Sequence, residues 1–387
     1  MNLYEVGIYM NCNSLPSLTF FTILNNQKIM VMKKFSFIVF AVIGSQLFAQ
    51  EGMVVPFDSD RWSFKGDAFT LHKEEGSSIM EFTGGDVTAY LKDADFTDGV
   101  ITYEIKIREE RTFLGCAFRM QDLENYESFY VRPHQSGNPD ATQYTPVYND
   151  LSAWQLYHGE GYASVVNYQF NEWIPVKIII SGSRAEVYFN DSLEPGLHMP
   201  YLQRKVKSGM IGLWGGSGKL KNFAYTKKPN VSLKSEPIPV ENPHSAVITD
   251  WSVYTDLFSE EHTEDLLNRA NGNKWLAMKS DAFGRLNLAK KLRLSENQNT
   301  ALVKYTLDSE SDTFKKLSFG FSDRVMIYVN GKRIYSGNNT FRSRDYRFLG
   351  SIGYFDSVFL PLKKGGNEII FAVSESFGGW GLMAKLD

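Results

Sequence analysis

The chain has 387 residues, of which 43% are hydrophobic and 22% charged, so it is long enough for about two globular domains. With a formal net charge of −3 the chain has no overall excess of basic residues, which argues against nucleic acid as a partner. Aromatic residues make up 14% of the chain, with 28 Phe and 20 Tyr, and this composition favours β structure.

An export signal is predicted over residues 32–49. A pair of lysines precedes the apolar run FSFIVFAVIG, and a small residue, Ala49, stands at the expected cleavage point. The run is too short to span a membrane, so we expect a secreted or periplasmic mature protein without a membrane span. Residues 1–31 then precede the true start at Met32 or Met30, and the alternative is a real extension with an internal anchor.

The chain contains two cysteines, Cys12 and Cys116. Cleavage at the predicted point would leave Cys116 alone, so the mature protein is expected to form no internal disulfide. Cys116 lies in the strand-like run FLGCAFRM, where a buried, inert thiol is expected rather than a nucleophile.

Short strand-like runs separated by turn residues fill the first half of the chain after the export signal. They are residues 101–107, 113–120, 173–182, 184–191 and 208–225. The run ITYEIKI alternates apolar and polar residues, whereas FLGCAFRM is apolar on both faces and is typical of a central strand. Repeated short strands without an amphipathic helix predict a β-sandwich.

The stretch from Glu124 to Tyr168 is unusually rich in Tyr and Trp. With a period of two, Tyr126, Ser128, Tyr130, Arg132 and His134 share one face of a predicted strand, opposite Phe129 and Val131. Sugars bind to aromatic rings with planar hydrogen-bonding groups beside them. The predicted ligand-binding residues are Tyr130, Arg132, His134, Gln143, Tyr144 and Trp154. The alternative is a well-packed sheet in which these tyrosines are purely structural.

The runs FTDGVITYEIKI, GCAFRMQDLENYESFYVRPH, WIPVKIIISGSRAEVYFND and GMIGLWGG occur in an order that resembles the concanavalin A-like lectin/glucanase superfamily. They are especially similar to laminin-G-like and DUF1080-type (3-keto-disaccharide hydrolase-like) bacterial domains. The resemblance covers residues 53–226 and implies a concanavalin A-like β-sandwich, or jelly roll. Because this fold hosts lectins, hydrolases and adhesion modules, the resemblance implies no single activity.

A polar, proline-rich stretch over residues 227–246 is predicted to be an extended linker. Residues 247–387 contain the clearest hairpin of the chain, in which Asn330-Gly331 is the signature of a type I′ turn. The strand YVNGK, the turn PLKKGGNEI and the terminal strand resemble a galactose-binding-like jelly roll. The predicted fold is therefore all-β, a concanavalin A-like β-sandwich plus a second, smaller galactose-binding-like β-sandwich.

In the second predicted domain, three residues are candidates for a ligand site. Arg344 lies in the arginine-rich run FRSRDYRF, which is able to clamp an anion but is expected to form an Arg–Asp network that pins a loop. Phe377 and Trp380 flank two glycines, and they form either a sugar platform or a plug that closes the jelly roll.

Glycoside hydrolysis needs two carboxyl groups flanking one bond. The sequence lacks the run of alternating acids that sandwich-type glucanases place on one strand. The remaining catalytic candidates are Glu124, Asp140 and Glu160. The DUF1080-type resemblance implies keto-sugar hydrolase chemistry, whose catalytic residues do not map onto this chain.

No cofactor is expected, with calcium as the open alternative. The six histidines are scattered, which argues against a zinc site. Asp140 and Asp150 are able to supply oxygen ligands, and laminin-G-like sandwiches often hold calcium, but such residues are also common in turns.

Three functions follow from these observations. The first is an exported carbohydrate-binding protein that recognises a glycan on a sheet face. The alternatives are a glycoside or 3-keto-glycoside hydrolase and an adhesion or scaffold module without a small ligand.

Overall fold

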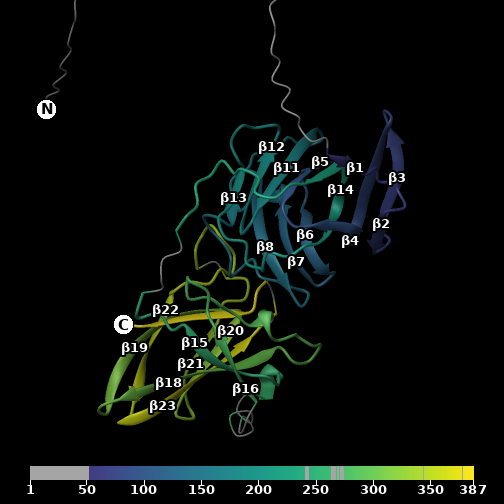
Figure 1. Ribbon diagram of the computed structural model, residues 1–387. Coiled ribbons are helices and arrows are strands. Elements are labelled where there is room, and N and C mark those ends of the chain that lie inside the picture. Colours follow the sequence, from purple (N-terminus) through teal and green to yellow (C-terminus); the bar gives the residue numbers. More distant parts are fainter. Residues whose placement is uncertain are drawn as a thin grey trace, which may run out of the picture. The chain divides into compact units, whose positions relative to one another are not determined.

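The computed structural model describes residues 52–239, 244–262, 267, 270, 274–342, 344–376 and 378–387. The predicted export signal lies outside the described residues, as does Phe377. Residues from Gln50 to Asp387 belong to one compact unit. Strands dominate this unit (Figure 1), so the all-β prediction is confirmed.

Fourteen strands of the described chain form one continuous hydrogen-bonded sheet. Their bounds are β1 Met53–Val54, β2 Trp62–Lys65, β3 Phe69–Glu74, β4 Ser77–Phe96, β5 Gly99–Lys106, β6 Leu114–Asp122, β7 Asn125–Val131, β8 Thr142–Tyr148, β9 Leu151–Ser152, β10 Ala163–Ser164, β11 Trp173–Ser181, β12 Arg184–Phe189, β13 Leu197–Met199 and β14 Gly209–Lys227. The main path runs β10-β8-β7-β6-β14-β5-β11-β12-β13. A short 3₁₀ helix, η1 (Pro133–Gln135), follows β7.

Strand β14 folds this sheet into two layers. Its first part pairs with β6 and its second part with β5, while β4 pairs along much of its other edge. Register shifts near Gly215 and a positive φ of 139° at Gly218 mark the bend between the two parts. Phe129 of β7 and Ile178 of β11, from different layers, belong to the same core. The two layers therefore form a β-sandwich.

Cys116 lies in this core and is fully buried, as expected. Burial in apolar surroundings raises the pKa of its thiol well above the usual value. The thiol therefore stays protonated and inert at neutral pH.

Two further sheets, with six and four strands among the described residues, form a second sandwich. Their bounds are β15 Asp250–Tyr254, β16 Trp275–Lys279, β17 Leu286–Asn287, β18 Thr300–Ser309, β19 Thr313–Ser322, β20 Arg324–Val329, β21 Lys332–Asn338, β22 Asp356–Leu362, β23 Gly365–Ser374 and β24 Gly381–Leu386, with 3₁₀ helices η2 Glu260–His262 and η3 Leu288–Lys290. Phe319 of the four-stranded sheet and Phe371 of the six-stranded sheet share one core.

The predicted type I′ hairpin is confirmed between β20 and β21. Val329 pairs with Lys332, so the connection has two residues, and Asn330 and Gly331 have φ values of 51° and 80°. Both central residues of a type I′ turn need positive φ, which Asn and Gly tolerate. The alternating residues Val325 and Ile327 face the core, as predicted.

The predicted linker is fastened to the first sandwich at Glu186 of β12. The fully buried Glu186 carboxylate accepts hydrogen bonds from the backbone N–H groups of Lys234 and Ser235, at 3.1 and 2.6 Å. The last strand of the first sandwich, β14, ends at Lys227, and the first strand of the second sandwich, β15, begins at Asp250. The predicted division into two domains remains a proposal.

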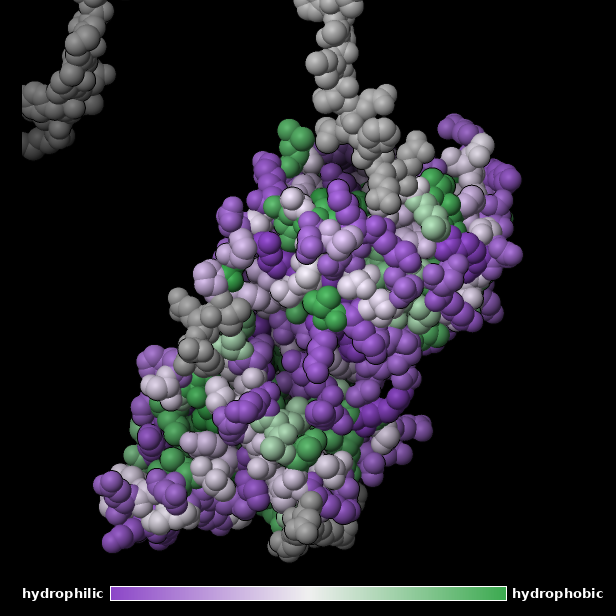
Figure 2. Space-filling model, in the orientation of Figure 1, coloured by the Kyte–Doolittle hydropathy of each residue, from purple (hydrophilic) through white to green (hydrophobic). Residues whose placement is uncertain are grey.

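The visible surface of the described chain is mostly hydrophilic, with apolar residues in separated groups (Figure 2). Among the described residues, no helix is both long enough and apolar enough to cross a membrane.

Candidate functional site

Three of the predicted ligand-binding residues meet where β7 ends. Tyr130 of β7 lies opposite Gln143 of β8 in the ladder, and its hydroxyl donates a hydrogen bond to Gln143 Oε1 at 2.7 Å. Arg132 Nη1 also lies 3.4 Å from Gln143 Oε1, and it forms an ion pair with Asp140. Tyr130 and Gln143 are almost fully buried, so most of this network lies beneath the surface.

His134 reaches the same region by a different route from the one predicted. Strand β7 ends at Val131, and His134 lies in η1, so the expected strand face does not extend that far. Its ring packs edge-on against Phe113 at 5.4 Å, and Phe113 in turn packs against Tyr130 at 5.9 Å. Burial, followed by the positive charge of Arg132, lowers the pKa of His134, so its imidazole is neutral at pH 7.

Tyr144 does not share this face, which corrects the prediction. Successive residues of a strand point to opposite faces, so Tyr144 points away from Gln143 and into the core. Its hydroxyl donates to Glu127 Oε2 at 2.5 Å and accepts a hydrogen bond from the Gln203 backbone N–H at 2.7 Å. Burial raises the pKa of Glu127 above the usual range for a carboxyl group.

Trp154 lies in the loop after β9 and packs against the second sandwich. A Cβ at Gly378 would lie only 2.5 Å from the Trp154 ring, so the indole covers this glycine closely. The Gln155 backbone N–H donates to the Gly378 carbonyl at 3.0 Å and fixes the loop there. Trp154 therefore contacts Gly378 of the second sandwich.

Trp214 of β14 lies beside Ser128 and Tyr130 and was not predicted from the sequence. Its indole lies directly over Gly115 of β6, where a Cβ would approach the ring to 2.6 Å. The ring Nε1–H donates to Ser128 Oγ of β7 at 2.9 Å, and the ring centre lies 5.6 Å from that of Tyr130. A lone Trp between glycines in the strand-like run GLWGG was the available signal. We call Phe113, Tyr130, His134 and Trp214 together the aromatic face.

Tyr126 adds a further ring to the same side of the sheet. It stands two and four residues before Ser128 and Tyr130 in β7, so all three point to one face. Burial, followed by the negative charges of Asp150 and Asp86, raises the pKa of Tyr126 to about 12. Asp86 lies in β4 and Asp150 in the turn after β8, and both are exposed. Carboxylates from two distant segments thus act on one hydroxyl.

The structure does not bring the three predicted catalytic residues together. Glu124 precedes β7 and forms an ion pair with Arg293, whereas Asp140 pairs with Arg132 beyond the other end of that strand. A seven-residue strand separates the two by about 20 Å. Glu160 is exposed and lines a separate cavity. These candidates therefore do not form a catalytic pair with each other.

The predicted calcium ligands do not fit one shared ion. Asp140 precedes β8 and Asp150 follows it, and the carboxylate of Asp140 is already engaged by the guanidinium of Arg132. Within the described part of the chain, no group of three or more His, Cys, Asp or Glu residues is arranged to hold a metal.

The two described candidates of the second sandwich have structural partners. Arg344 forms a bidentate ion pair with Asp356, at 2.9 and 3.1 Å, and Arg347 pairs with Asp345. These bonds match the expected Arg–Asp network. Trp380 is fully buried, and its Nε1–H donates to the Val373 carbonyl at 2.9 Å. Of the two roles considered for Trp380, the structure places it in the core.

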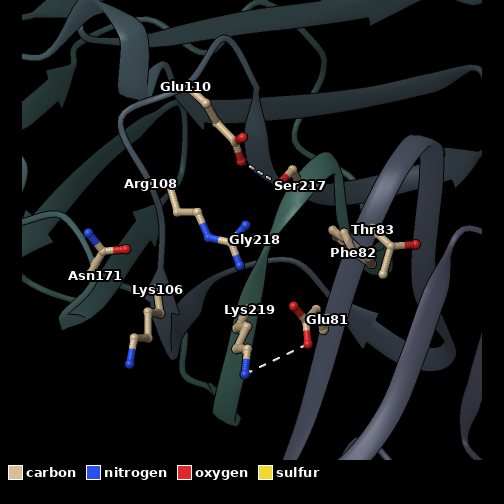
Figure 3. Close-up of a pocket in the computed structure, with 10 residues that line it drawn as sticks. All are labelled: Glu81, Phe82, Thr83, Lys106, Arg108, Glu110, Asn171, Ser217, Gly218 and Lys219. Carbon is tan, nitrogen blue, oxygen red and sulfur yellow. Dashed lines mark hydrogen bonds and ion pairs between the residues drawn. The ribbon is translucent and has the colours of Figure 1, made fainter.

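A polar cavity of about 450 Å³ lies between β4, the end of β5 and the bend of β14 (Figure 3). Two pairs of its polar side chains interact with each other. Lys219 lies 3.7 Å from Glu81, and the Ser217 hydroxyl donates to Glu110 at 2.6 Å, as the dashed lines of Figure 3 mark. With carboxylates beside its cations, this cavity has no clear preference for a ligand charge.

No known family model matches the chain, and no curated protein matches it either. Several solved structures are similar to part of it. The carbohydrate-binding module CBM66 from Bacillus subtilis has 16% identity and a TM-score of 0.31, and the alignment covers 44% of this chain and 94% of that one. The exoplasmic domain of VIP36 with Ca²⁺ and Man3GlcNAc has 9% identity, a TM-score of 0.35 and coverages of 49% and 92%. The Bacillus licheniformis β-glucanase has 12% identity, a TM-score of 0.32 and coverages of 46% and 100%.

Proposed function

We propose that the aromatic face binds carbohydrate. The observation that carries the proposal is the position of Trp214, whose indole is held over Gly115 and bonded to Ser128 while it remains partly exposed. A ring fixed in this way loses little side-chain entropy when the apolar face of a sugar stacks on it.

Polar groups beside the rings support the same assignment. Arg132 and His134 are partly exposed, and both lie close to Phe113. A guanidinium offers paired N–H donors to neighbouring hydroxyls, and a neutral imidazole is able to donate and to accept. Rings for the apolar face of a pyranose and donors for its hydroxyl rim are thus adjacent.

A glycan array, followed by calorimetry with the best glycan, tests this proposal. Trp214→Ala should weaken binding by about 1–3 kcal/mol, the scale of a lost stacking anchor. Trp173→Ala is the matched control, because Trp173 is a partly exposed Trp on β11 that packs near Lys221 instead. Unchanged affinity in Trp214→Ala would contradict the proposal, and an array without any hit would favour the scaffold alternative.

Export remains part of the proposal. The prediction of export rests on the lysine pair, the short apolar run and Ala49 in the sequence. Mass spectrometry of the exported protein should find a mature N-terminus near Gln50 or Glu51. Residues 1–31 still attached would contradict this expectation.

A further inference from the structure

A second cavity, of about 770 Å³, is built from segments that are far apart in the sequence. His158 and Tyr162 come from the loop between β9 and β10, and Tyr201 follows β13. Phe283 and Arg285 precede β17 in the second sandwich, and Tyr354 precedes β22. The size lies within the usual range for small-molecule sites, about 300–1,000 Å³.

The guanidinium of Arg285 is rigidly held in the wall of this cavity. Its Nε donates to Asp281 at 2.8 Å, and its two terminal nitrogens donate to the Leu156 carbonyl at 3.3 Å and to the Tyr162 hydroxyl at 3.1 Å. The guanidinium also lies 4.6 Å from the ring centre of Tyr157. Since a guanidinium carries five N–H groups, these three bonds leave two donors without an acceptor among the described residues.

The charge of Arg285 is already matched within the chain. Asp281 is its ion-pair partner, and both side chains are at most 14% exposed. An anionic ligand would therefore compete with a buried, preformed partner, whereas a neutral hydroxyl needs only the two remaining N–H donors. The wall thus favours an uncharged, hydroxyl-bearing ligand over an anion.

Aromatic rings cover another part of the wall. Phe283 is 46% exposed, and its ring centre lies 5.5 Å from that of Tyr201. The guanidinium of Arg285 lies 4.7 Å from the Phe283 ring, and the Tyr201 hydroxyl donates to the Ile238 carbonyl at 2.5 Å. The Arg285 guanidinium therefore restrains the Phe283 ring, and the hydrogen bond to Ile238 restrains the Tyr201 ring. The Tyr354 hydroxyl is buried and has no hydrogen-bond partner in the described part of the chain.

We propose that this cavity binds the end of a neutral saccharide, as a second site separate from the aromatic face. Tyr201 and Phe283 offer ring surface for the apolar face of a sugar, and Arg285 offers N–H donors for its hydroxyls. Glu160 lines the same cavity and is exposed, so its carboxylate is able to accept hydrogen bonds from further hydroxyls. The site uses none of the residues of the aromatic face.

Saturation-transfer NMR and calorimetry on the full chain test this inference. The probes are glucose, galactose, mannose, xylose, N-acetylglucosamine, cellobiose and maltose at millimolar concentration. Phe283→Ala removes the exposed ring, and Ala282→Trp fills the cavity. Each should raise the Kd of the best probe at least about tenfold, or ~1.4 kcal/mol. Phe359→Ala, which removes another exposed ring, from β22, should leave the Kd unchanged.

The two sites can be told apart with Trp214→Ala, which leaves the cavity intact. If the cavity binds, the probe stays bound in Trp214→Ala and is lost in Ala282→Trp. Three outcomes overturn the inference: no probe binds the parent, both cavity variants bind as the parent does, or binding is lost only in Trp214→Ala. If binding is lost only in Trp214→Ala, the aromatic face stands and the second site does not.

Discussion

The indole Nε1–H of Trp214 donates a hydrogen bond to Ser128 Oγ at 2.9 Å, and this bond reaches from β14 over β6 to β7. It is possible because the intervening residue of β6 is Gly115, which has no Cβ to lift the ring off the sheet. One hydroxyl thus determines the orientation of the ring that we propose as the sugar platform.

We expect Ser128→Ala to weaken glycan binding and to lower the free energy of unfolding by about 1–3 kcal/mol. The substitution leaves the indole N–H of the partly buried Trp214 without an acceptor. Urea unfolding and calorimetry measure the two effects. Ser164→Ala on the edge strand β10 serves as the control, and equal behaviour of the two variants would contradict the role given to Ser128.

Glu127 should make the stability of the protein fall as the pH rises. Burial raises its pKa in the folded state, so the folded chain holds the proton over a wider pH range than the unfolded chain. The stability that the protonated Glu127 contributes is fully present below its unfolded pKa of about 4.3. This contribution is lost as the pH rises through its folded pKa.

The measurement compares urea unfolding of the parent and of Glu127→Gln from about pH 4 to about pH 8. We expect the parent to lose stability relative to the variant over this range, because glutamine does not titrate. Parallel pH profiles would show that the pKa of Glu127 is not raised in the folded state.

Glu186 should restrain the segment that is predicted to be an extended linker. Burial raises its pKa, but the hydrogen bonds from the Tyr188 hydroxyl and from the backbone N–H groups of Ser235 and Lys234 outweigh burial, and the pKa is lowered overall. The stabilisation is therefore present above the unfolded pKa and is lost as the pH falls through the folded pKa.

We expect Glu186→Ala to expose this segment to limited proteolysis at neutral pH, with a loss of about 1–3 kcal/mol for the buried N–H groups left unpaired. Glu194→Ala is the control, since Glu194 is exposed and contacts Lys234 only through its side chain. Equal cleavage rates in the two variants would show that Glu186 does not restrain the segment.

The hairpin turn gives a test that is independent of any ligand. Gly331 has a φ of 80°, so Gly331→Val should cost roughly 1–3 kcal/mol in backbone strain. Gly366→Val in β23 is the control, because that glycine has no positive φ and has room for a Cβ. The measurement compares the melting temperatures of the two variants with that of the parent. An unchanged value for Gly331→Val would contradict the assigned turn.

Local patterns in the sequence predicted several of the strands, although the strand predicted to include His134 ends at Val131. Alternation in 101–107 predicted β5, the strand-like run at 173–182 predicted β11, and Asn330-Gly331 predicted the hairpin, because these signals depend on neighbouring residues alone. The proximity of Tyr130, Arg132 and Gln143 was also predicted. The error at Tyr144 was avoidable, since adjacent residues of one strand point to opposite faces.

Only the tertiary structure decided which distant residues meet. Trp214 lies 86 residues from Ser128, and Arg285 lies 123 residues from Tyr162, yet both pairs are hydrogen-bonded. No local period reports such contacts, because they depend on the order of strands in the sheet and on how the loops pack. The sequence by itself determined that the chain forms strands rich in aromatic residues. Strand pairing and burial then determined that Tyr144 and Trp380 belong to the cores and that Trp214 remains partly exposed.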